Sequence, residues 1–113
     1  MKEIKAIIQP FKVSEVTDAL EAIPGVGGIT ALDVRGFGHQ RGRNGMEARA
    51  HGSVNYLPKV MLLLVVPDTL VDTVLATIQR QAHTGNIGDG KVFVSPVEDA
   101  LRLRTGERGD AAL

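Results

Sequence analysis

The chain has no cysteine, few aromatic residues, no net charge and no long apolar run. Without cysteine it has no disulfides, no thiolate metal sites and no cysteine nucleophile. Lysine plus arginine number 13, as do aspartate plus glutamate, so no overall charge draws the protein to nucleic acid or to an anionic membrane. With three phenylalanines, one tyrosine and no tryptophan, there is little aromatic surface on which bases could stack.

Chain length and apolar run length bound the class of protein. The longest apolar run, residues 60–66, is far too short to cross a bilayer, and an N-terminus that carries Glu3 is not a signal peptide. A chain of 113 residues has room for one domain with a thin core. We therefore expect a single cytoplasmic domain over residues 1–113.

The first third of the chain predicts a strand, a helix and a second strand. Apolar alternation over residues 4–8 indicates a strand that ends before Pro10. Apolar residues at i, i+3, i+4 and i+7 indicate a helix that Pro24 and Gly25 end, and residues 29–34 predict the second strand. The helical stripe consists of Val16, Ala19, Leu20 and Ile23.

The second half repeats this order. Residues 60–66 predict a third strand and residues 92–94 a fourth, before a polar tail at about 98–113. Between them, Asp68 is expected to cap a second helix, with Gly85 past its end. The apolar stripe of this helix consists of Leu70, Val71, Val74, Leu75 and Ile78.

A long segment without apolar periodicity, at about residues 38–55, separates the second and third strands. Five glycines fall between positions 36 and 53, among several arginines. Loops longer than roughly 12 to 15 residues in compact domains are usually functional or disordered. We therefore predict a long flexible loop at this point.

The predicted order, strand-helix-strand followed by a second strand-helix-strand, is the duplicated split βαβ pattern of an α+β, ferredoxin-like sandwich. Its two helices can cover only one face of the sheet. Because residues 61–66 are apolar at odd and even positions alike, the other face must be buried as well, and we predict self-association. The alternative is that the loop or the tail covers that face.

A glycine-rich stretch, residues 84–94, is the first candidate site. From Gly85 it follows the phosphate-loop pattern G-x-x-x-x-G-K, but Val92 stands where a magnesium-binding hydroxyl is needed, and a strand follows instead of a helix. A nucleoside-triphosphatase loop is therefore excluded. What remains is a backbone that a ligand can approach closely, with Lys91 as a point charge for phosphate. An ordinary turn before a strand is the alternative.

The tail carries a second candidate. In Leu101-Arg102-Leu103-Arg104, an extended backbone would place both guanidinium groups on one side and both leucines on the other. Such a pair of arginines suits a phosphate. A solvated amphipathic edge is the alternative.

Other chemistries have weaker signals. Arg35-Gly36-Phe37-Gly38 begins like an RNA-recognition signature, which His39 then breaks, so RNA binding is a minor alternative and no nucleic-acid partner is expected. No serine, histidine and acid form a nucleophilic set, so we expect no enzyme beyond slow ATP hydrolysis, although a small phosphotransfer domain is a rival. The histidines His39, His51 and His83 have no zinc-site spacing and are expected to be solvated.

Five stretches together resemble the PII signal-transduction family, and the resemblance covers nearly the whole chain. The most specific is the Thr-x-x-x-Gly-Asp-Gly-Lys-Val-Phe block that starts at Thr84. The resemblance implies a ferredoxin-like homotrimer with ATP or ADP in the clefts between subunits, which would bury the second sheet face. The other four stretches are Gln9-Pro10-Phe11-Lys12, Gly36-Phe37-Gly38-His39-Gln40-Arg41-Gly42, Leu57-Pro58-Lys59-Val60 and Arg102-Leu103-Arg104-Thr105-Gly106.

The resemblance also implies roles for single residues. Gln40 would bind Mg²⁺ beside the ATP phosphates, and Lys59 would pair with a carboxylate of 2-oxoglutarate, whose keto acid end chelates the same ion. A small hard cation prefers such oxygen ligands. The residues implied in nucleotide binding are Thr30, Gly36, Gly38, Val65, Gly88, Asp89, Gly90, Lys91, Arg102 and Arg104, the two arginines holding phosphates.

The implied activity is that of a switch. ATP with 2-oxoglutarate, and ADP alone, would hold residues 39–53 in different conformations that select a membrane transporter or a regulated enzyme. The chain lacks the loop tyrosine that many relatives uridylylate, because the corresponding place is at or beside Gly52 and its only tyrosine is Tyr56. We interpret it as a divergent nitrogen-regulatory protein of this family. A PII-like regulator of metal efflux or inorganic-carbon uptake with another effector is the alternative.

Overall fold

The computed structural model describes residues 1–37 and 56–113, so the predicted loop at 38–55, with Gly38 and Gln40, lies outside the described residues. The predicted order of strands and helices is confirmed. The elements are β1 (Lys2–Ile8), α1 (Val13–Glu21), β2 (Thr30–Gly36), β3 (Leu57–Val66), α3 (Val71–Ala82) and β4 (Gly90–Pro96), with 3₁₀ turns at Pro10–Lys12, Asp68–Leu70 and Gly109–Ala112.

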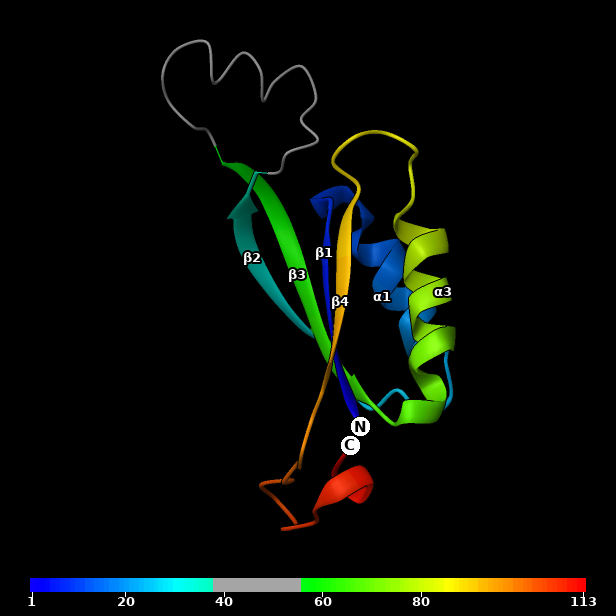
Figure 1. The fold of residues 1–113 in the computed structure, drawn as a ribbon, viewed down its shortest axis with the longest axis vertical. Helices are drawn as coiled ribbons and strands as arrows, with labels where there is room; N and C mark the ends of the chain where they lie inside the picture. Colours follow the sequence, from blue (N-terminus) through cyan, green and yellow to red (C-terminus); the bar gives the residue numbers. More distant parts are fainter. Residues whose placement is uncertain (38–55) are drawn as a thin grey trace.

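The four strands form one antiparallel sheet in the order β2-β3-β1-β4. Both helices lie on the same side of this sheet, as Figure 1 shows. This arrangement is the ferredoxin-like α+β sandwich that the repeated strand-helix-strand pattern predicts. Among the described residues, no helix is both long and apolar enough to cross a membrane.

The core lies between the sheet and the two helices. Because side chains alternate along a strand, the even-numbered residues of β1 and β3 point to the helices, and those from Ile4 to Ile8 and from Val60 to Val66 are buried. From the other side, α1 contributes Val16 and Leu20, and α3 contributes Val74 and Ile78. The strand residues are Ile4, Ala6, Ile8, Val60, Leu62, Leu64 and Val66.

The opposite face of the sheet, which we call the open face, is apolar too. Its β3 residues are Met61, Leu63 and Val65, which are half-buried by their neighbours on the sheet. On the flanking strands Leu32 is 40% and Phe93 is 54% exposed. No described segment covers this face, because the C-terminal tail lies beyond the end of β4 (Figure 1). The idea that the tail covers it is therefore wrong, the idea that the predicted loop covers it falls on residues outside those described, and self-association remains a prediction.

Asp68 does not cap the second helix as predicted. It begins the 3₁₀ turn Asp68–Leu70, and α3 starts only at Val71, without a side-chain cap. The Asp68 carboxylate instead lies 2.9 Å from the Met1 amino nitrogen and 3.7 Å from Lys2 Nζ. The hydrogen bond from the amino group and the nearby positive charges lower the pKa of Asp68. This residue thus joins the start of β1 to the end of β3.

Candidate functional site

The loop between α3 and β4 is organised by the Asp89 carboxylate. It accepts hydrogen bonds from the backbone N–H groups of Thr84 at 2.8 Å and Gly85 at 3.0 Å, and from the Thr84 hydroxyl. That hydroxyl in turn accepts a bond of 3.1 Å from the N–H of Asn86. These donors, the hydroxyl first, lower the pKa of Asp89, so the carboxylate is ionised at neutral pH and ties the two ends of the loop together.

Lys59 connects β3 to this loop. Its ammonium donates a 2.7 Å hydrogen bond from Nζ to the carbonyl oxygen of Gly88. Burial lowers the pKa of Lys59, and the negative charge of Asp89 opposes this effect. Among the described residues Lys59 has no ion-pair partner, so it presents a partly desolvated positive charge whose nearest partner is a neutral carbonyl. Such a group is suited to binding an anion.

Two glycines give the loop its close backbone contacts. Gly88 and Gly90 have φ values of 102° and 107°, in the left-handed region that favours glycine. A Cβ on Gly90 would lie 1.7 Å from the carbonyl oxygen of Ile7, so no side chain fits there. A Cβ on Gly88 would lie 3.0 Å from Gln9 Nε2 and 3.5 Å from Lys59 Nζ, so two nitrogen groups converge on this loop.

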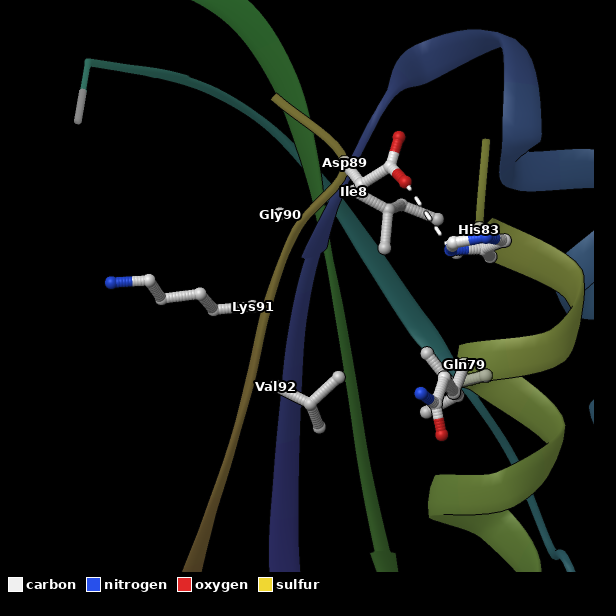
Figure 2. Close-up of a pocket in the computed structure, with 9 residues that line it drawn as sticks. Ile8, Gln79, His83, Asp89, Gly90, Lys91 and Val92 are labelled. Atoms are coloured by element: carbon white, nitrogen blue, oxygen red, sulfur yellow. Dashed lines mark ion pairs between the residues drawn. The ribbon is translucent and has the colours of Figure 1, made fainter. Parts of the chain in front are cut away.

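Lys91 lies at the end of the open face nearest this loop. Figure 2 shows its side chain leaving β4 on the side away from α3, whereas Asp89 and His83 face the helix. A pocket of about 140 Å³ lies between α3 and β4, with an apolar floor that includes Ile78 and Val92. Because the Lys91 side chain points away from it, the predicted phosphate ligands do not converge on this pocket.

His83 stands at the rim of the same pocket. Its Nδ1 lies 3.7 Å from Asp89 Oδ2, and its side chain is 67% exposed. His83 is thus a solvated histidine, as predicted, while His39 and His51 lie outside the described residues.

Arg102 and Arg104 do not lie on an extended segment, so that prediction is wrong. The backbone reverses direction between Leu101 and Arg108, which form a β-bridge, and the N–H of Arg102 bonds to the Glu107 carbonyl at 2.9 Å. Gly106, with a φ of 78°, completes the turn. The alternation of arginine and leucine could not reveal this reversal, because the same alternation is expected for a straight extended segment and for one arm of a hairpin.

The predicted nucleotide residues fall into two groups that lie apart on the sheet. In β4, Gly90 pairs with Ile8 and Pro96 with Lys2, so Lys91 and the tail are separated by the length of a seven-residue strand, about 20 Å. A single chain does not bring the two groups together. The group at the Gly90 end contains Gly36, Gly88, Asp89, Gly90 and Lys91, beside Lys59, the residue predicted for 2-oxoglutarate; the other contains Val65, Arg102 and Arg104 at the tail end, with Thr30 near the middle of the sheet.

Two residues at these groups were missed by the sequence reasoning. Gln9 follows β1 directly, and its Nε2 would lie 3.0 Å from a Cβ on Gly88, a proximity that follows from the antiparallel pairing of β1 with β4. Glu107 accepts a hydrogen bond of 3.1 Å from Arg102 Nη1. The two residues are five positions apart in the sequence, and only the hairpin brings their side chains into contact.

The fold and the glycine-rich loop define a small ferredoxin-like domain, and comparison with known proteins identifies its family. The family model described as Nitrogen regulatory protein P-II matches residues 1–107. The chain is 49% identical to Nitrogen regulatory protein P-II of Azospirillum brasilense, and 50% identical to that of Rhodospirillum rubrum and to Nitrogen regulatory protein P-II 1 of Escherichia coli K12. Each comparison spans 113 residues and the whole of both chains.

The chain therefore belongs to the P-II family of nitrogen regulatory proteins. Members of this family are signal-transduction regulators that interact with targets, not enzymes of the usual kind. The resemblance drawn from the five sequence stretches is confirmed.

Proposed function

We propose that this protein binds ATP or ADP and, together with Mg²⁺, 2-oxoglutarate, and that it controls a transporter or an enzyme from the cytoplasm through residues 39–53. The observation that carries this proposal is the 2.7 Å bond between Lys59 Nζ and the Gly88 carbonyl. It joins the residue proposed for the effector directly to the loop proposed for the nucleotide. A ligand that engages one of them changes the contacts of the other.

The described residues fit a nucleotide. Gly88 and Gly90 carry no side chain that would shield the backbone, and the Lys91 ammonium, next to Gly90 in β4, extends onto the open face, as Figure 2 shows. Arg104 makes no hydrogen bond or ion pair with any described residue, so its guanidinium is available for a phosphate. A flexible ammonium and planar guanidinium groups are common phosphate ligands.

The described residues also fit a small dicarboxylate such as 2-oxoglutarate. The ammonium of Lys59 is held near the open face and partly desolvated, which strengthens its attraction for a carboxylate. Gln40, proposed to bind Mg²⁺ between the ATP phosphates and the keto acid, lies outside the described residues. When bound, the ion would supply a charge that attracts both phosphates and 2-oxoglutarate oxygens.

A homotrimer accounts for two features of the single chain. The tail-end group with Arg102 and Arg104 can complete a site only with the Gly90-end group of another protomer. Assembly also buries the apolar open face, on which Leu63 lies near the centre. We propose that each nucleotide lies at a boundary between two protomers.

Calorimetry tests the proposed function. ATP with Mg²⁺ is titrated into the protein with and without 2-oxoglutarate, and we expect 2-oxoglutarate to tighten ATP binding but not ADP binding. Equal ATP affinity in both titrations would refute the effector assignment, and no binding of either nucleotide would refute the nucleotide site. The names of the relatives support nitrogen regulation over metal efflux or inorganic-carbon uptake.

A further inference from the structure

The two arginines of the tail hairpin differ in what they contact. Arg102 Nη1 donates to Glu107 Oε1 at 3.1 Å, and Arg102 Nη2 donates to the backbone oxygen of Leu113 at 2.7 Å. Arg104, two residues on, is exposed and makes no hydrogen bond or ion pair with any described residue. One guanidinium is therefore already engaged by a carboxylate of its own chain, and the other is not.

We propose that Glu107 is an internal competitor for phosphate at Arg102. Without nucleotide, the Glu107 carboxylate is paired with the Arg102 guanidinium. A phosphate of the nucleotide has to displace this carboxylate, so Glu107 lowers the affinity for nucleotides. Arg104, which has no such competitor, makes the first contact. This inference rests on the proposed function, in which Arg102 holds a phosphate.

The contacts around the pair permit this exchange. The Arg102 side chain is 37% exposed and that of Glu107 45%, and ion pairs exposed to this extent are weak. A nucleotide phosphate carries more charge than one carboxylate and accepts several hydrogen bonds, so it competes well for the same N–H groups. The bond to the backbone oxygen of Leu113 uses Nη2 and the Glu107 bond uses Nη1, so a phosphate can replace Glu107 without displacing the Leu113 contact.

The hairpin itself does not depend on the charge of Glu107. Backbone bonds from the N–H of Arg102 to the Glu107 carbonyl at 2.9 Å and from the N–H of Gly106 to the Arg102 carbonyl at 2.8 Å form the turn. The Glu107 Oε1 also accepts a 2.8 Å bond from the Thr105 hydroxyl. Glutamine keeps an oxygen that accepts from both Arg102 and Thr105, so Glu107→Gln removes the charge and preserves the contacts.

The test is calorimetric titration of ATP and of adenosine into the full chain and its variants at fixed salt. We expect Glu107→Gln to bind ATP about two- to fivefold more tightly, the range expected when an exposed ion pair no longer has to be broken. Adenosine, which has no phosphate, should bind both proteins equally. Glu98→Gln is the matched control, because Glu98 is an exposed carboxylate of the same tail without an ion-pair partner among the described residues.

A double variant assigns the effect to Arg102. Arg102→Ala with Glu107→Gln should bind ATP no more tightly than Arg102→Ala alone. Unchanged or weaker ATP binding by Glu107→Gln, with normal binding by the unaltered protein, would overturn the competitor role and leave the proposed function standing. A gain that Glu98→Gln reproduces, or one that persists without Arg102, would also overturn it. If the unaltered protein binds no ATP, both the proposed function and this inference fail.

Discussion

The backbone of Gly90 lies so close to Ile7 that a Cβ on Gly90 would be 1.7 Å from the Ile7 carbonyl oxygen. Since β1 and β4 are held together by their ladder, an alanine at this position has to displace backbone, and its φ of 107° is strained as well. We expect Gly90→Ala to lower the free energy of unfolding by about 2–4 kcal/mol.

Urea unfolding measures this effect, and Gly28→Ala is its matched control. A Cβ on Gly28 would have no atom within 4 Å, and the φ of Gly28 is not positive, so the same substitution there should cost less than about 1 kcal/mol. Equal stability of Gly90→Ala and the unaltered protein would contradict this, because it would show that the Gly90 backbone can move away from Ile7 at little cost.

Lys59→Met should uncouple the effector from the nucleotide. Methionine keeps the apolar stem but removes the ammonium that bonds to the Gly88 carbonyl. We expect 2-oxoglutarate to no longer tighten ATP binding, while ADP affinity changes little and the free energy of unfolding falls by about 1 kcal/mol.

Titrations of ATP with and without 2-oxoglutarate check this outcome. Lys5→Met is the control, because Lys5 is another lysine of the open face, 45% exposed and paired with Glu3 at 3.3 Å. A full response to 2-oxoglutarate in Lys59→Met would remove Lys59 from the effector site.

Ionisation of the loop carboxylate Asp89 makes the free energy of unfolding rise with pH in the acid range. Its pKa in the folded protein is below the ordinary value of 3.8, chiefly because the Thr84 hydroxyl donates to it. The folded protein therefore binds fewer protons than the unfolded chain in acid, so the carboxylate stabilises the fold above that value and loses this effect as pH falls through its folded-state pKa.

Comparison with Asp89→Asn isolates this effect. The difference in unfolding free energy between the two proteins should be largest above about pH 5 and should shrink as the solution is acidified. Asp68 and Asp99, whose pKa values are also lowered, are present in both proteins and cancel. A difference that stays constant from neutral pH to acid would contradict the assignment to ionised Asp89.

Leu63→Glu should dissociate the proposed trimer. Leu63 is on the open face of β3, opposite Thr30 in one register and Lys5 in the other, so a carboxylate there would be buried on assembly but solvated in a single protomer. Light scattering should give a mass near the 12.1 kDa of one chain for this variant and three times that mass for the unaltered protein.

Phe11→Glu is the control for that experiment, because Phe11 is 68% exposed and lies in the 3₁₀ turn after β1, outside the strands of the sheet. It should leave the oligomer intact. An unaltered protein that is monomeric, or a Leu63→Glu protein that keeps the larger mass, would rule out assembly through the open face.

Apolar periodicity was sufficient to find every strand and helix that the structure describes, because the apolar faces of β1 and β3 and the stripes of both helices bury against one another. It did not find the strand ends. The structure extends the third strand back to Leu57 and the fourth on to Pro96, beyond their apolar runs. Sheet ladders use backbone groups, so exposed residues such as Pro58 and Ser95 lie within strands without contributing to the pattern.

The amino-acid order alone determined the class of fold, the glycine-rich character of residues 84–91 and the family, since these are properties of local pattern. It could not show that Gly90 must be glycine because of Ile7, that Lys59 bonds to Gly88, or that Arg102 is held by Glu107. Each of these contacts joins residues whose separation along the chain says nothing about their distance in space. Folding the sheet and the tail hairpin sets those distances, and with them the division of the predicted nucleotide ligands between two parts of one protomer.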